Sequence, residues 1–85
     1  MRPENKRMQT YLAANGIRAN VKYIPDGSLK HTWRLSELNT PWTEELAIKL
    51  NELGFTNFDG IQLGKYAGNG GVFSVFVRGH NELLA

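Results

Sequence analysis

The sequence has no cysteine among its 85 residues, so neither disulfides nor thiolate metal sites can hold the fold together. It also lacks a long apolar run, since its longest, VFSVFV, falls far short of the about 20 residues that a membrane-spanning helix needs. The opening MRPENKRMQTYLAANG has no apolar core of a secretory signal. We therefore expect a soluble, cytoplasmic protein with no membrane partner.

Catalytic groups are also scarce. The chain has two histidines, and no Ser/His/Asp or Cys/His arrangement stands out. The glycine-rich stretch LGKYAGNGGVF lies between two strand signals and lacks the Gly-Lys-Ser/Thr tripeptide of a nucleotide-binding loop. We predict that the protein is not an enzyme and binds no metal or cofactor.

What is present is typical of one small globular domain spanning residues 1–85. The hydrophobic fraction is 41% and the charged fraction is 21%, both ordinary values for a folded domain. The net charge of +2 favours acidic partners only weakly. The positions of the charges therefore matter more than their sum.

Two segments have the apolar spacing of helices. Pro3 suits the first turn of one helix, and Gly16 is placed to end it. Thr43 is a suitable N-cap for the second, and Gly54 is placed to end that one. At both ends we expect a left-handed glycine cap that folds the following apolar residue back onto its helix.

Four segments have strand signals. Residues 17–23 and 29–35 alternate between apolar and polar side chains. Residues 61–67 lie between the turn dipeptides Asp59-Gly60 and Asn69-Gly70, and 72–77 is apolar at nearly every position. The last segment is expected inside the sheet with both faces covered. The order helix, hairpin, helix, strands predicts an α+β domain with an antiparallel sheet of about four strands and two helices on one face.

The hairpin register follows from its turn. Side-chain alternation favours a loop at 25–27 with a bulge. This register places Lys22 opposite Lys30 and Arg18 opposite Arg34 on the polar face. It pairs Asn20 with Thr32 there and turns Tyr23, His31 and Trp33 to the apolar face.

Like charges side by side are mildly destabilising, and two explanations compete. The first, which involves no binding role, is a solvated cationic face that discourages aggregation. The other is a platform for nucleic-acid phosphates, with a double-stranded or structured partner favoured because Tyr23 and Trp33 are expected to point inward. The candidate nucleic-acid-binding residues are Arg18, Asn20, Lys22, Lys30, Thr32 and Arg34.

A protein-interaction role is the alternative. An adaptor or inhibitor could dock through the glycine-rich loop and the C-terminal VRGHNEL, or onto an acidic protein surface. A hairpin turn and a polar tail are the simpler explanation of these two segments. The candidate partner-binding residues are Lys65, Asn69, Gly70, Gly71, Arg78 and His80. The sequence leaves the oligomeric state open.

Overall fold

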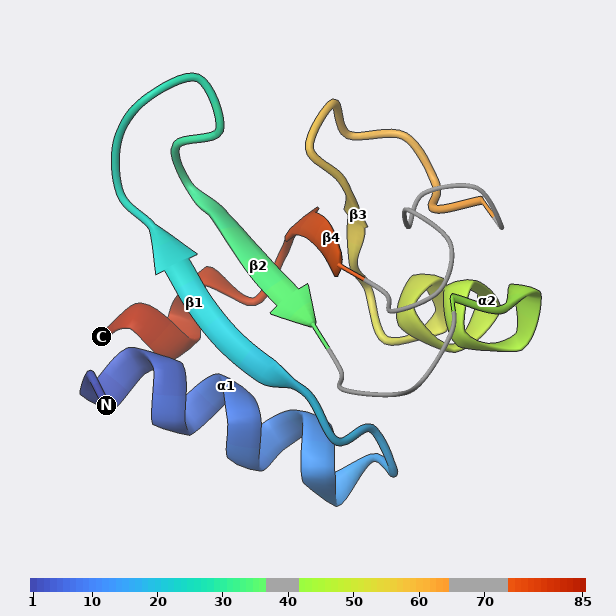
Figure 1. Cartoon of the computed structure of the whole chain (residues 1–85), viewed down its shortest axis with the longest axis horizontal. Coiled ribbons are helices and arrows are strands. Elements are labelled where there is room, and N and C mark those ends of the chain that lie inside the picture. The colour runs from blue at the N-terminus through green and yellow to red at the C-terminus, as the bar shows by residue number, and fades with distance from the viewer. Residues whose placement is uncertain (37–41, 65–73) are drawn as a thin grey trace.

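The computed structural model describes residues 1–36, 42–64 and 74–85 (Figure 1). The elements in chain order are α1 (Pro3–Ala14), β1 (Asn20–Ile24), β2 (Thr32–Ser36), α2 (Glu44–Glu52), β3 (Thr56–Asn57), β4 (Ser74–Arg78) and the 3-10 helix η1 (Asn81–Leu84). The strands form one antiparallel sheet in the order β1-β2-β4-β3. The predicted α+β class is confirmed. Within the described ranges, no helix combines the length and apolar character needed to cross a bilayer.

Both predicted glycine caps are present, with φ of +81° at Gly16 and +96° at Gly54. After Gly16, the N–H of Ile17 donates to the Leu12 carbonyl oxygen at 2.8 Å, and the corresponding bond after Gly54 is 3.0 Å long. The hydroxyl of Thr43 caps the N-terminus of α2, as predicted. These ends were predictable because each cap is made by residues close in sequence.

The core lies between α1 and one face of the sheet, which we call the inner face. Helix α1 runs along β1, and α2 lies at the side of the sheet opposite β1 (Figure 1). Trp33 is fully buried, which confirms its predicted core position, and its indole N–H donates to the Gly79 carbonyl oxygen at 2.9 Å. Ala47 and Leu50 of α2 belong to the same buried cluster.

The predicted hairpin register is wrong, although its two faces are right. Lys22 lies opposite Arg34 instead of Lys30, so its partner is four positions further along (34 − 30). The loop between the strands therefore covers 25–31. This loop is longer than the predicted loop at 25–27 because His31 takes a left-handed φ of +67°. The N–H of His31 donates to the Ile24 carbonyl oxygen at 2.7 Å.

Two predicted orientations at the start of β2 change with the register. His31 is exposed, not turned to the apolar face, and its Nδ1 lies 3.0 Å from the Tyr23 hydroxyl. Thr32 is fully buried, not solvent-facing, and its hydroxyl donates to the Leu29 carbonyl oxygen at 2.6 Å. A β-branched hydroxyl satisfied locally can be buried at little cost.

The predicted strand at 61–67 does not form over 61–64, and the rest of it lies outside the described residues. Leu63 is instead held by Asn51 of α2, whose side-chain amide accepts from the Leu63 N–H at 2.8 Å and donates to its carbonyl oxygen at 2.9 Å. The expected turn at Asp59-Gly60 is present, with a φ of +83° at Gly60. It follows the short strand β3, which pairs with β4.

Strand β4 lies between β2 and β3, which confirms its predicted place inside the sheet. The prediction that both of its faces are covered is wrong, because burial alternates along the strand. Val75 and Val77 are buried, whereas Phe76 is only half-buried and lies outside the core cluster. The sheet thus has one covered face and one more open face, which we call the outer face.

Candidate nucleic-acid interface

A row of three side chains crosses the middle of the outer face. Lys22 of β1 lies opposite Arg34 of β2, which lies opposite Phe76 of β4. Residues directly opposite in an antiparallel sheet have Cβ atoms about 5 Å apart. Lys22 and Arg34 are exposed. We call this set the outer row.

The positions around the outer row carry no acid. Asn20, Ser36 and Ser74 form the next row on one side, and Ile24 with Thr32 lies on the other. Within the described ranges, neither cation of the outer row takes part in an ion pair. Two like charges therefore stand side by side without compensation, which favours an anion between them.

An open hollow of about 490 Å³ adjoins the outer row. All three residues of the row line it, and residues 25–29 of the β1–β2 loop line it as well. Asp26 in that loop is the carboxylate among the lining residues. The hollow joins two cations to an aromatic ring, a combination suited to an anion that carries an apolar group.

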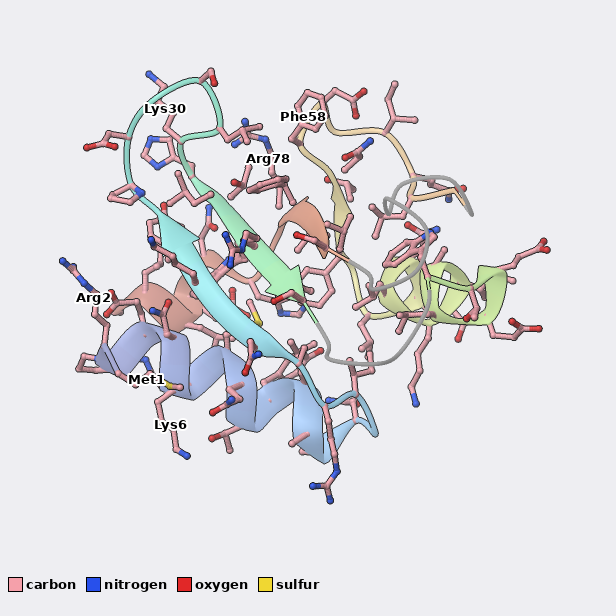
Figure 2. The ribbon with its side chains drawn as sticks, in the orientation of Figure 1. Met1, Arg2, Lys6, Lys30, Phe58 and Arg78 are labelled. Atoms are coloured by element: carbon pink, nitrogen blue, oxygen red, sulfur yellow. The ribbon has the colours of Figure 1, made fainter. Side chains whose placement is uncertain are left out.

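The structure brings together only part of the predicted platform. Asn20, Lys22 and Arg34 share the outer face. Arg18 precedes β1 and lines a separate hollow beside α1, so the expected pair with Arg34 does not form. Lys30 belongs to the exposed loop (Figure 2) and does not face Lys22.

Thr32, the sixth predicted residue, lies on the outer face at the position opposite Ile24. Its hydroxyl is buried and already donates to a backbone carbonyl. It therefore offers no donor to a ligand. The interface that remains is smaller than predicted, with Lys22 and Arg34 as its cations.

The candidate partner-binding residues fall into two groups, those outside the described residues and those engaged within the protein. Lys65, Asn69, Gly70 and Gly71 lie outside the described residues. Arg78 is engaged within the protein (Figure 2): its Nε donates to the Phe58 carbonyl oxygen, and its Nη1 lies 3.2 Å and 3.5 Å from the carbonyl oxygens of Lys30 and His31. Its guanidinium thus ties the β1–β2 loop to the segment after β3.

His80 is also engaged within the protein. Its ring lies 4.7 Å from the ring of Tyr11 and 4.6 Å from that of Phe55. Nε2 lies 2.5 Å from the Leu53 carbonyl oxygen at the C-terminus of α2, and Nδ1 lies 3.1 Å from a carboxylate oxygen of Glu82. A backbone hydrogen bond of Glu82 itself and the contact with His80 lower the pKa of the Glu82 carboxyl below its usual 4.5.

Phe76 is the residue of the interface that sequence reasoning missed. The run VFSVFV at 72–77 predicts a strand covered on both faces, because it is apolar at nearly every position. The available signal was alternation, since Val75 and Val77 on one face leave Phe76 on the other. That signal would have placed Phe76 on the face opposite Val75 and Val77, although its position beside Arg34 depends on the pairing of β2 with β4.

Comparisons with protein-family models, curated proteins and solved structures find no match to this chain. Within the part of the chain that the structure describes, no three His, Cys, Asp or Glu side chains lie together in a way that could hold a metal ion. The interface must therefore be interpreted from its own chemistry.

Proposed function

We propose that this protein is a small binding module that contacts the phosphate backbone of nucleic acid through the outer face of its sheet. The observation that carries the proposal is the pair Lys22 and Arg34, directly opposite each other and without an ion-pair partner in the described residues. A phosphate between them would receive charge-assisted hydrogen bonds and remove their repulsion.

A solvated cationic surface is the competing explanation, and position distinguishes the two. Cations that serve only solubility need no particular neighbours. Lys22 and Arg34 instead line the same hollow and are flanked by hydrogen-bonding side chains such as Asn20 and Ser36. This grouping supports a binding role.

A non-catalytic role is part of the proposal. The outer row consists of a lysine, an arginine and a phenylalanine. The row contains no histidine and no carboxylate, the side chains that most often act as general bases. The row suits recognition of a charged polymer better than its chemical conversion.

The test is fluorescence anisotropy with labelled mixed-sequence duplex and single-stranded oligonucleotides, titrated at low and near-physiological salt. Two double variants are compared with the parent. Lys22→Ala/Arg34→Ala removes the pair, and Arg18→Ala/Lys30→Ala removes two cations elsewhere. Each variant lowers the net charge from +2 to 0, so a difference between them reports position and not total charge.

We expect the parent's affinity for duplex to fall with salt at a log–log slope of at least about −0.9, the contribution of the one phosphate neutralised between Lys22 and Arg34. The Lys22/Arg34 variant should lose most binding and most of that slope, whereas the Arg18/Lys30 variant should keep both. Equal losses of affinity in the two variants would show that binding depends on net charge and not on the positions of Lys22 and Arg34. Absence of binding at low salt to either form of nucleic acid would refute the proposal.

A protein-interaction role is the second candidate, favoured by exposed apolar side chains in the segment after β3. Phe58 is 46% exposed and Ile61 is 64% exposed. An apolar contact centred on them would respond far less to salt than phosphate binding. A partner that binds equally well at both salt concentrations, and is lost on Phe58→Ser/Ile61→Ser, would favour this candidate.

A further inference from the structure

We propose that the outer row binds unpaired nucleic acid, with a base stacked on Phe76 and the adjacent phosphate held by Lys22 and Arg34. This inference rests on the proposed function and names its ligand class. It replaces the duplex expectation with a single strand. That expectation depended on the inward orientation of Tyr23 and Trp33 and did not include Phe76.

The position of Phe76 is the first support. It lies directly opposite Arg34, so the Cβ atoms of the two residues are about 5 Å apart. It is half-buried, lies outside the core cluster, and forms no aromatic pair with another described residue. The ring is therefore placed beside a phosphate-binding group without contributing to the core.

The lining of the hollow is the second support. Ile24, Pro25 and Leu29 line it together with Phe76, so the hollow offers apolar surface as well as the two cations Lys22 and Arg34. A duplex presents phosphates and sugars outward and keeps its base faces stacked. Its base faces therefore cannot contact the apolar residues of the hollow. An unpaired nucleotide offers both an anion and an apolar face.

Size and charge are consistent with this ligand. The volume of about 490 Å³ is ample for one nucleotide, since small-molecule sites occupy roughly 300–1,000 Å³. The carboxylate of Asp26 also lines the hollow and repels a phosphate, which favours a phosphate close to Lys22 and Arg34. The phosphate thus lies beside the two cations in this proposal, and the base lies on the ring of Phe76.

The experiment separates stacking from backbone binding by the choice of probe. Three labelled probes are titrated at low salt: an oligothymidylate of about 12 nucleotides, within the range of known single-strand site sizes, an abasic strand of equal length, and a duplex. Phe76→Leu keeps an apolar side chain but removes the ring. Phe58→Leu is the matched control, since it removes an exposed ring that does not line the hollow.

We expect the parent to bind oligothymidylate more tightly than either the abasic strand or the duplex. Phe76→Leu should weaken oligothymidylate binding about 5- to 150-fold, the range for losing one stacked base, and should leave abasic binding unchanged. Phe58→Leu should change neither. Thermal unfolding of each variant confirms that it is folded.

Three results would overturn the inference. Equal affinity of the parent for thymidylate and abasic strands would exclude stacking, and this comparison needs no variant to fold. Tighter binding of the duplex, or unchanged thymidylate binding in Phe76→Leu, would assign the site to backbone contacts alone and leave the proposed function standing. Failure to bind any of the three probes would remove the proposed function itself.

Discussion

Arg34 and Arg78 lie on neighbouring strands and face the same side of the sheet, yet they differ in exposure and in hydrogen bonding. Arg34 is exposed and forms no side-chain hydrogen bond or ion pair with a described residue. Arg78 is half-buried and directs its guanidinium at three backbone carbonyl oxygens. A cation whose donors are already used supports the fold, while a cation with free donors is available to a ligand.

The same contrast extends to the residues around each arginine. Arg34 lies beside Lys22, whose charge is equally uncompensated in the described part of the chain. Arg78 is followed by Gly79, whose carbonyl oxygen accepts from Trp33, and by His80, which contacts the end of α2. The C-terminal segment that resembled a polar tail in sequence is therefore a connection between the sheet, its loops and α2.

The largest effect expected from breaking this connection is that of Gly79→Ala. Gly79 has a φ of +136°, and an added Cβ would lie 3.1 Å from the Gly54 carbonyl oxygen. We expect a loss of about 3 kcal/mol in the free energy of unfolding, from backbone strain and this contact together. Urea unfolding followed by circular dichroism measures it.

Gly27→Ala is the control for Gly79→Ala, because Gly27 also has a positive φ, +86°, but no atom lies within 4 Å of its added Cβ. Its loss should be about 1 kcal/mol, the cost of a left-handed non-glycine residue alone. Equal losses at the two positions would show that the close approach at Gly79 contributes nothing.

The next effect is the direct contrast between the two arginines. Arg78→Ala should lower the free energy of unfolding by about 2 kcal/mol, since hydrogen bonds from a charged donor are lost. Arg34→Ala should change it by about 0.5 kcal/mol or less, as is usual at an exposed position. The same urea experiment measures both, and a larger loss for Arg34→Ala would reverse their assigned roles.

The smallest effect concerns Glu82. Because its pKa is lowered in the folded state, its ionised carboxylate stabilises the fold fully above the usual pKa of 4.5. That contribution disappears as the pH falls through the folded pKa. Glu82→Gln should therefore lower the urea midpoint of unfolding at about neutral pH. The difference in midpoint from the parent should vanish in strong acid.

The effect of Glu82→Gln should become smaller, but not zero, in a His80→Gln background. The contact with His80 is then lost, while the backbone hydrogen bond of Glu82 remains. An unchanged difference in that background would show that His80 has no part in holding the carboxylate.

Local features of the fold were predictable because their causes are close in sequence. The caps at Gly16 and Gly54 and the N-cap at Thr43 each depend on residues within about one helical turn. The inward face of the hairpin was predictable because alternation survives any even shift in register. This is why Trp33 was placed correctly although its partner was not.

Features of the candidate interface were less predictable, since they depend on distant segments. The loop at 25–31 is longer than its turn residues indicate, and Arg78, remote in sequence, holds two of its carbonyl groups. Leu63 was expected in a strand, but Asn51 of α2 takes its backbone hydrogen bonds.

The sequence by itself determined the α+β class, the helix ends and which hairpin side chains face inward, because hydrophobic periodicity and capping are short-range effects. Only the tertiary structure decided that Lys22 faces Arg34, that Phe76 joins them, and that Arg78 and His80 are occupied. These outcomes depend on strand register and on hydrogen bonds between segments up to 48 positions apart. Such pairings depend on how the whole chain satisfies its backbone groups and are not encoded in any local pattern.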